Sequence, residues 1–520
     1  MGAPFGALVY ASCVVLILSW LLKYMKWVWL EPKKLERLLN DQGIKGSPYK
    51  FLMGDMRDEA RLMSEARSRP IPLTHDIVPR VDPLFDQLVK THGKMFVWWF
   101  GPIPRVAIMD PELVREILSN KFGHFAKPES NPIVKLLASG VAIYNGEKWA
   151  KHRRIISPSF HQEKLKLMLP AFSTSCDELI NRWKKLVDSS NEEHCELDVW
   201  PELLNLTGDV ISRTAFGSSY EEGRRIFQLQ RELAELIFQL LKFLPIPGYR
   251  FLPTKRILRM REMDKEVRGI LNSIINKRLN AMRLGEACND DLLGVLLESN
   301  FKLSQEQNNS KSLALTIEDI IEECKLFYFA GQETTSVLLT WTIILLCMHQ
   351  DWQSRARQEV LQVFGDDKPN LDGLNHLKIV TMVLYEVLRL YPPAVHLIRR
   401  TYKEIKLGEV TFPSGVQLSL PILSIHRDPE IWGDDACEFK PERFSEGIAK
   451  ASKDRVAFFP FGWGPRICIG QNFALMEAKL AIAMILQNFS LELSPTYSHA
   501  PHTVLTLQPQ HGAQVLLHRI

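Results

Sequence analysis

The sequence predicts a mainly helical protein with a minor β-sheet portion, preceded by one N-terminal transmembrane helix. Three observations lead to this fold class. The apolar pattern is helical over most of 111–283 and again over 316–390 and 471–489. Two short regions, 95–109 and 405–420, carry turn residues between brief apolar runs, as strand pairs do. The N-terminal stretch is almost continuously apolar.

That N-terminal stretch contains no charged residue from Met1 to Leu22, and its apolar character continues to Leu30. This exceeds the roughly 20 residues that span a bilayer. Lysine and arginine follow the stretch and none precedes it, so the positive-inside rule places the C-terminal body in the cytosol. A cleaved signal peptide is the alternative, but a basic n-region and a small-residue cleavage site are absent. We expect a retained anchor over 1–30 and a hinge region with basic, glycine and proline residues over 31–60.

The composition narrows the class of protein. The chain has 520 residues, 46% of them hydrophobic and 24% charged, which suffices for a large core. Length alone suggests about three domains. Eight cysteines are scattered without the spacing of a disulfide framework, which indicates a reducing compartment. The net charge of +4 is too small to suggest a nucleic-acid partner.

The body begins with a predicted β-hairpin, in which Gly101–Pro104 separates apolar runs over 95–100 and 105–109. The helical region that follows is interrupted by prolines, and we expect breaks at each of them and at the turn 245–248. The polar stretch 305–312 is typical of a solvated loop. The interrupting prolines are Pro128, Pro132, Pro158 and Pro170.

The longest predicted helix opens the second half of the chain. Thr316 and Asp319 form a capping box at its start, and the helical pattern continues to about His349. The elements that follow are helices over 352–364 and about 375–390, strand pairs over 405–420 and a helix over 471–489.

The most informative residue is Cys468, just ahead of the last predicted helix. Gly464 and Gly470 permit turns that bring backbone close to a flat cofactor, and Arg466 offers a fork of donors for a carboxylate such as a haem propionate. The positive N-terminus of the following helix stabilises a thiolate. A thiolate ligand to haem iron favours O–O cleavage. A buried structural cysteine is the alternative, whereas zinc is rejected because Cys468 has no C-x-x-C or nearby histidine partner.

Inside the longest predicted helix, the run Ala330–Thr335 combines a glycine with Glu333 and Thr334. A glycine in a helix interior costs about 1 kcal/mol relative to alanine. Small residues let a flat ligand approach, and a hydroxyl can bond back to a carbonyl and bend the helix. Splitting iron-bound dioxygen consumes protons, so a carboxylate beside a hydroxyl suits a proton relay. Taken alone, the same residues could be a glycine kink with a solvated Glu-Thr face.

Together these motifs resemble those of the cytochromes P450. The run that ends at Gly470 matches F-x-x-G-x-R-x-C-x-G, and Ala330–Thr335 matches A-G-x-[DE]-T-[TS]. The resemblance implies one haem domain over 61–520 that binds haem b, with Cys468 as the axial ligand of the iron. It also implies that Thr334 delivers protons and that Glu333 is its acidic partner. The cofactor-binding residues that it implies are Cys468, Arg466, Phe461, Trp149, Arg153 and His396.

Two of these assignments depend on weaker patterns. Trp149 and Arg153 match the family's W-x-x-x-R, and their spacing puts both on one helical face, although an amphipathic basic helix has the same pattern. His396 falls where many relatives place another arginine that binds a propionate. It either replaces that arginine or faces the substrate.

Glu386 and Arg389 stand at i and i+3 of an apolar predicted helix, where they can pair. The spacing alone means little, because Glu112 and Arg115 share it and are expected to be an ordinary solvated pair. Buried charges need partners, and Arg443 lies in a segment that resembles the family's third member of such a group. We interpret Glu386, Arg389 and Arg443 as a structural network without a catalytic step.

The resemblance covers essentially the whole chain. Within the family, the chain resembles the plant branch that contains secologanin synthase and triterpenoid oxidases. It implies a single-pass protein of the endoplasmic reticulum membrane with a cytosolic haem domain. The implied activity inserts one oxygen atom from O2 into an apolar, terpenoid substrate (a triterpenoid or iridoid), using electrons from NADPH through NADPH–cytochrome P450 reductase. A haem-thiolate isomerase or dehydratase that needs no reductase, a fatty-acid hydroxylase and a non-enzymatic haem sensor are the alternatives. The apolar residues expected to face substrate are Ile133, Leu136, Leu137, Phe238, Leu240, Leu241, Phe329, Val395 and Val504.

Overall fold

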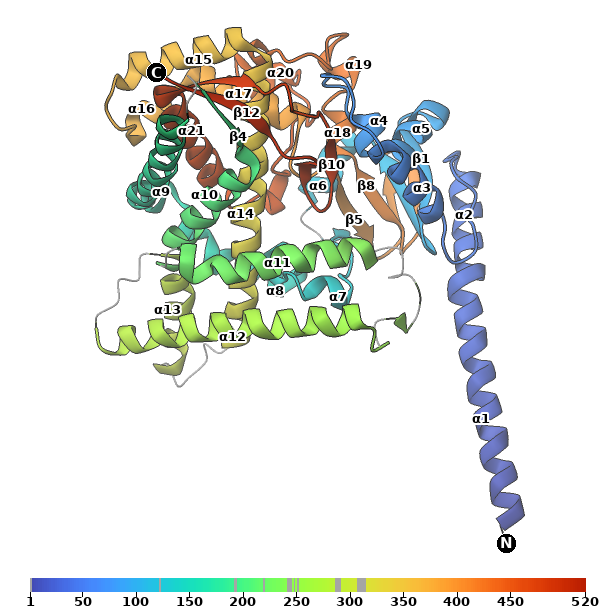
Figure 1. Cartoon of the computed structure of the whole chain (residues 1–520). Helices are drawn as coiled ribbons and strands as arrows, with labels where there is room; N and C mark the ends of the chain where they lie inside the picture. Colours follow the sequence, from blue (N-terminus) through green and yellow to red (C-terminus); the bar gives the residue numbers. More distant parts are fainter. Residues whose placement is uncertain are drawn as a thin grey trace.

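The computed structural model shows a long N-terminal helix that projects from a body of helices and small sheets (Figure 1). Helices make up most of the body, and the strands form separate small sheets among them. This confirms the predicted fold class. The structure describes residues 2–120, 123–190, 194–217, 220–240, 246, 248–249, 252–285, 291–305 and 315–520.

The projecting helix is continuous from α1 (Gly2–Met25) through a π-helical turn at Lys26–Leu30 into α2 (Glu31–Asp41). Its apolar side chains are exposed, for example Leu22 at 71%. Among the described residues it is the one helix that is long and apolar enough to cross a membrane. Apolar side chains left in water would be costly, so this exposure agrees with the predicted N-terminal membrane helix.

The segment after α2 packs on the body, within the region 31–60 where we predicted a hinge. Gly46 forms a parallel bridge with Val97 of strand β1 (Met95–Phe100). A Cβ at Gly46 would lie 1.9 Å from the carbonyl oxygen of Val97, so no larger residue fits there. Tyr49 is buried, and its hydroxyl donates to the carbonyl of Val28. These contacts fix the end of the projecting helix against the sheet.

Helix α14 (Ile317–Met348) runs through the centre of the body (Figure 1). Its capping box between Thr316 and Asp319 is present as predicted, with Thr316 Oγ1 3.0 Å from the Asp319 nitrogen. Nearly every side chain from Ile320 to Cys347 is buried, because other helices surround α14. The helices of the body before α14 are α3 (Met56–Arg67), α4 (Val78–Val81), α5 (Pro83–His92), α6 (Pro111–Ser119), α7 (Pro132–Lys135), α8 (Gly146–Ile156), α9 (Gln162–Ser189), α10 (Val199–Phe216), α11 (Tyr220–Leu240), α12 (Lys255–Arg283) and α13 (Leu292–Gln305).

The helices after α14 agree with the predicted ones to within a few residues. The C-terminal member, α21, packs against α14 and α9, so the residues just before it are carried to the centre of the body. These helices are α15 (Gln350–Phe364), α16 (Leu371–His376), α17 (Lys378–Leu390), α18 (Ile422–Ile425), α19 (Pro429–Trp432), α20 (Ile448–Ala451) and α21 (Gln471–Asn488).

The expected break at Pro170 is wrong, because α9 continues through that residue. A proline inside a helix removes a hydrogen bond and costs about 3 kcal/mol. Here Leu165 and Met168 before the proline and Phe172 after it are all buried on one face of the helix, against α10 and α21. Tertiary packing therefore outweighs the local preference. The predicted loop 305–312 and turn 245–248 lie mostly outside the described residues.

The largest sheet has the strand order β1-β2-β8-β5-β3. The predicted hairpin is confirmed as the antiparallel pair β1–β2, and β2 pairs in parallel with β8. A second sheet has the order β4-β12-β9, and the predicted strands over 405–420 form the hairpin β6–β7 and strand β8. The remaining strands are β2 (Ile103–Ile108), β3 (Phe125–Ala126), β4 (His194–Asp198), β5 (Leu397–Thr401), β6 (Ile405–Leu407), β7 (Val410–Phe412), β8 (Gln417–Leu420), β9 (Phe489–Leu493), β10 (Pro501–Thr503), β11 (Leu507–Pro509) and β12 (Gln514–Arg519).

Candidate active site

The loop that carries Cys468 is held by tight turns and by its own backbone. The Cys468 nitrogen donates to the carbonyl of Phe461 at 2.8 Å, which closes the loop. Gly462 and Gly464 have φ of +75° and +69°, a conformation that favours glycine. A Cβ at Gly464 would also lie 2.4 Å from the carbonyl oxygen of Leu118. The motif glycines therefore fix the path of the backbone that presents the thiol.

The thiol of Cys468 lies deep in the protein and nevertheless has accessible surface, so it lines an internal space. Burial raises the pKa of Cys468, while the backbone N–H of Gly470 and the charges of Arg153 and Lys127 lower it. The surroundings alone do not make this cysteine a thiolate. A metal ion bound to the sulfur would do so, because a coordinating thiol is deprotonated outright. The position therefore fits an axial ligand to a buried iron.

Four cationic side chains form what we call the propionate cluster. Lys127 and Arg153 act on Cys468, and Arg399 and Arg466 act on Lys127. Burial, with the nearby arginines second, lowers the pKa of Lys127 to about 7. Burial and Arg466 lower the pKa of Arg399 to about 10, and burial and Arg153 lower that of Arg466 to about 10. Like charges thus gather in a poorly solvated place.

Among the described residues, the hydrogen-bond acceptors of this cluster are neutral oxygens, and no carboxylate forms an ion pair with it. Arg466 donates to the carbonyl of Tyr144 at 2.8 Å and to the side-chain oxygen of Asn145 at 3.0 Å. The Nζ of Lys127 donates to the carbonyl of Ala142 at 2.5 Å. Buried charges need counter-charges. The two propionate groups of haem b would supply the missing negative charge, so the cluster fits that cofactor.

The two residues of the predicted W-x-x-x-R pattern both lie at this site, on α8. The guanidinium carbon of Arg466 is 4.4 Å from the centre of the Trp149 ring, a cation–π contact that joins α8 to the cysteine loop. Arg153, one turn further along α8, lies close enough to lower the pKa of Cys468. The geometry therefore favours the cofactor-binding interpretation over a solvated basic helix.

His396 differs from the arginines of the propionate cluster in its hydrogen-bond partners. Its Nε2 is 2.5 Å from Asp82 Oδ2, and its Nδ1 is 3.2 Å from Ser419 Oγ. Three residues later on β5, Arg399 joins the propionate cluster with only 5% of its surface exposed. Sequence reasoning missed Arg399 and Lys127. The signal for Arg399 was a pair of arginines in a strand, where alternation turns one of them inward.

The run Ala330–Thr335 lies in the middle of α14, where some side chains of the otherwise buried central part of the helix are accessible. Phe329, Ala330, Gly331 and Thr334 are partly accessible while the turns on either side are buried. Thr334 Oγ1 donates to the carbonyl of Ala330 at 2.8 Å, the back-bond expected from the sequence. This face presents a hydroxyl and small side chains to an internal space.

Gly331 has a second role that the sequence did not reveal. A Cβ at this position would lie 2.6 Å from Cγ1 of Ile211 on α10. Thr207, also on α10, donates its hydroxyl to the carbonyl of Gln332 at 2.8 Å. The missing side chain thus lets α10 pack closely on α14 beside the accessible face.

Glu333 is buried, with 9% of its surface exposed, so the alternative of a solvated Glu-Thr face is wrong. Its Oε1 accepts hydrogen bonds from Thr506 Oγ1 at 2.7 Å and from the amide of Gln508. Burial raises the pKa of Glu333, and these two hydrogen bonds oppose the shift. Glu333 therefore retains a proton more readily than an exposed glutamate, and it directly precedes Thr334 in the chain.

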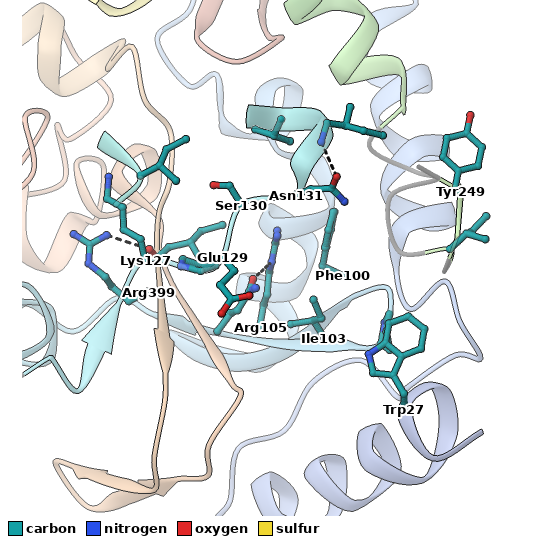
Figure 2. A pocket seen from close by; sticks show the side chains of 18 of the residues that line it. Trp27, Phe100, Ile103, Arg105, Lys127, Glu129, Ser130, Asn131, Tyr249 and Arg399 are labelled. Atoms are coloured by element: carbon teal, nitrogen blue, oxygen red, sulfur yellow. Dashed lines mark hydrogen bonds between the residues drawn. The ribbon is translucent and has the colours of Figure 1, made fainter. Parts of the chain in front are cut away.

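A cavity of about 1060 Å³ opens beside the propionate cluster (Figure 2). Phe100, Ile103 and Trp27 supply apolar walls, and Arg105 reaches in from β2. The guanidinium of Arg105 lies over the Phe100 ring at 4.1 Å, and its Nε donates to Gln417 Oε1 at 2.9 Å. The cavity extends to Trp20 and Trp27 of the projecting helix, and thus reaches toward the predicted membrane.

Of the residues expected to face substrate, Ile133 lines this cavity. Phe329 and Val395 are partly buried against the core, and Leu240 is fully buried. Leu241 lies outside the described residues.

Glu386 and Arg389 form a two-pronged ion pair with N···O distances of 2.7 Å, and both side chains are 0% exposed. Arg443 Nε lies 3.5 Å from Glu386 Oε1, as the structural interpretation requires. Glu112 and Arg115, with the same spacing, pair at 2.6 Å but remain 57% and 62% exposed. Context thus separates the two pairs, and the buried one lies away from the accessible face of α14.

Comparison with known proteins finds similar sequences over nearly the whole chain. A sequence model of the family described as Cytochrome P450 matches residues 79–517. Cytochrome P450 CYP72A616 of Paris polyphylla is 62% identical over 99% of both chains. Cytochrome P450 72A15 of Arabidopsis thaliana is 56% identical over 99% of both chains. Echinocystic acid 23-monooxygenase of Saponaria officinalis is 53% identical over 98% of both chains.

Proposed function

The chain belongs to the cytochrome P450 family, and from this premise we propose that it inserts one oxygen atom of O2 into a terpenoid substrate. The family establishes an oxidoreductase that carries haem b with a cysteine thiolate as axial ligand. Electrons come from NADPH through a separate reductase. The haem domain faces the cytosol, and the N-terminal helix anchors it in the endoplasmic reticulum membrane.

Each residue of the site has a distinct role in this proposal. Cys468 would ligate the iron, while the propionate cluster and Trp149 would hold the propionate groups of the cofactor. Haem with an axial thiolate supplies the activation of O2 and the cleavage of its O–O bond. Thr334 offers a hydroxyl at the accessible face of α14, and Glu333 stores the proton that this hydroxyl passes on.

The observation that carries the proposal is that a partly accessible threonine, Thr334, and a buried carboxyl group, Glu333, follow each other in the middle of α14. Burial raises the pKa of Glu333, so this carboxyl group can hold a proton on the helix that carries Thr334. An isomerase or dehydratase that acts without a reductase has no need of this relay. The pair therefore supports a monooxygenase over these alternatives.

The proposed substrate class rests on the cavity and on one relative. The cavity has a volume of about 1060 Å³, enough for a bulky polycyclic skeleton, and its lining combines apolar side chains with polar and charged ones such as Arg105, Glu129 and Asn131. The relative from Saponaria officinalis is named for the oxidation of echinocystic acid, a triterpenoid. The contact of the cavity with Trp20 and Trp27 supports a substrate that partitions into the membrane.

Microsomes that contain this protein and a plant reductase test the proposal. They are incubated with NADPH and a panel of triterpenes, iridoids and fatty acids, and mass spectrometry detects substrates that gain one oxygen atom. Cys468→Ala is the control and is expected to lose the thiolate spectrum and all product. A product that forms without NADPH would support an isomerase instead, and a thiolate spectrum retained in Cys468→Ala would refute the ligand assignment.

Thr334→Ala tests the relay within the same preparation. The variant should bind haem normally but consume NADPH with far less product per NADPH, because proton delivery typically contributes a factor of about 10² or more. Product formed per NADPH and peroxide release are measured together. Coupling equal to that of the wild type would remove Thr334 from the mechanism.

A further inference from the structure

The C-terminal hairpin β10–β11 packs against the helix that carries the proton relay. Its strands are antiparallel, with Thr503 opposite Leu507 and a tip of three residues between them. The carbonyl of Leu507 accepts from Trp341 Nε1 of α14 at 2.8 Å, and its nitrogen donates to the carbonyl of Pro393 at 3.1 Å. Arg67 of α3 donates to the carbonyl of Thr503 at 2.5 Å. The hairpin is thus fixed to three separate parts of the body.

Two side chains of this hairpin bind the same oxygen of Glu333. Thr506 Oγ1 donates to Glu333 Oε1 at 2.7 Å, and Gln508 Nε2 donates to the same atom. Gln508 Nε2 also lies 3.3 Å from Thr506 Oγ1, so the three polar groups form one cluster. Among the described residues, none donates a hydrogen bond to the other oxygen, Oε2. One side of the carboxyl group is therefore held and the other is left for proton exchange.

Few other groups act on this carboxyl group. Arg231 of α11 is the one charged residue among the described part of the chain that lowers its pKa, and Arg231 is exposed. Screening by water weakens such a charge. Direct hydrogen bonds from Thr506 and Gln508 thus determine the position of the carboxyl group and oppose the effect of its burial.

We propose that Thr506 and Gln508 are positioning residues for proton delivery, which hold the carboxyl group of Glu333, the residue that directly precedes Thr334 on α14. The inference rests on the proposed monooxygenase function. Thr506 is the last of the three tip residues, next to Val504 and Leu505, and 37% of Leu505 is exposed. A substrate that contacts the tip therefore acts on the same short turn that binds Glu333.

The position of the carboxyl group is tested by infrared titration of the substrate-free holoenzyme. The band of the protonated Glu333 carboxyl group is identified by its loss in Glu333→Gln. Thr506→Val and Gln508→Leu each remove a donor to the carboxylate, so the midpoint pH of this band should rise. Thr503→Val is the matched control, because this buried hydroxyl on the same hairpin has no hydrogen-bond partner among the described residues.

An unchanged midpoint in both variants, or an equal rise in Thr503→Val, would overturn the proposal. The reduced carbon-monoxide spectrum confirms that each variant retains its folded haem site.

Coupling during turnover gives a second, independent readout. Thr506→Val and Gln508→Leu should form severalfold less product per NADPH, and Thr506→Ser, which keeps the hydroxyl, should behave as the wild type. Loss of coupling in Thr506→Ser as large as in Thr506→Val would contradict a role for the hydroxyl. A wild-type enzyme that forms no NADPH-dependent product would instead refute the proposed function, and the infrared titration would still decide whether the hairpin holds Glu333.

Discussion

Two groups of buried arginines in this protein differ in what surrounds them. Arg389 has a carboxylate partner, Glu386, and also donates to the backbone carbonyls of His426 and Ala436. Arg399 and Arg466, in the propionate cluster, lie among other cations and donate to neutral oxygens. The first group has its counter-charge within the chain, whereas the second would gain its counter-charge from an anionic cofactor.

The difference shows how a structural charge can be told from a binding charge. Desolvation disfavours both groups, but only the first is compensated by an ion pair of the protein itself. In the second group the same desolvation lowers the pKa values of Arg399 and Arg466 to about 10. A cluster that is unfavourable in the protein alone indicates a ligand of opposite charge.

The largest expected effect on stability comes from removing Arg389, the arginine whose carboxylate partner lies within the chain. Arg389→Leu leaves the Glu386 carboxylate buried without its partner, which should lower the free energy of unfolding by about 3–5 kcal/mol. Arg115→Leu removes an arginine at the same spacing from an exposed pair and should change it by less than about 1 kcal/mol. Denaturant unfolding of both variants checks the prediction, and similar losses in the two would show that burial does not separate these pairs.

Removing one member of the propionate cluster should act on the cofactor instead of the fold. Arg399→Leu is expected to weaken haem binding by about ten- to a hundredfold, the effect of one charge-assisted hydrogen bond. The apoprotein should lose little stability, because the variant also removes a repulsive cation. Haem transfer to an acceptor protein measures the affinity, with Arg400→Leu on the same strand as control. Unaltered haem release from Arg399→Leu would remove that residue from the propionate cluster.

The smallest expected effect concerns a buried carboxyl group that has neither an ion-pair partner nor a hydrogen-bond donor in the described part of the chain. Glu477 on α21 is 1% exposed, and both of its oxygens lack a hydrogen bond among the described residues. Burial raises the pKa of Glu477 well above 4.5.

The folded state therefore binds this proton more tightly than the unfolded state. The contribution of protonated Glu477 to the free energy of unfolding is fully present below about pH 4.5. This contribution is lost as the pH rises toward the pKa of Glu477 in the folded state. Glu477→Gln should remove this dependence, so its gain in stability over the wild type should grow as the pH rises from 5 to about 8. Thermal unfolding across this range is the measurement, and a gain that does not vary with pH would show that Glu477 has a charge partner.

Local motifs predicted much of the site because their geometry is set by nearby residues. The loop of Cys468 needs a glycine at Gly464, which adopts a positive φ and belongs to the motif. Gly470, the other glycine expected in a turn, has an ordinary φ of −91°, and the positive φ of Gly462 was not expected. The capping box of Thr316 and Asp319 formed as predicted, because its geometry is also set by nearby residues. By contrast, Pro170 did not break α9, because residues distant in sequence bury the helix on both sides of it.

The sequence by itself determined the mainly helical class, the N-terminal apolar helix and the residues of the motifs, since each depends on periodicity or on spacing within a few residues. Only the tertiary structure decided their partners. Arg399 and Lys127 join Cys468, and Thr506 and Gln508 bind Glu333 from more than a hundred residues away. These contacts depend on how distant elements pack, and the periodicity of one segment carries no information about which segment will lie against it.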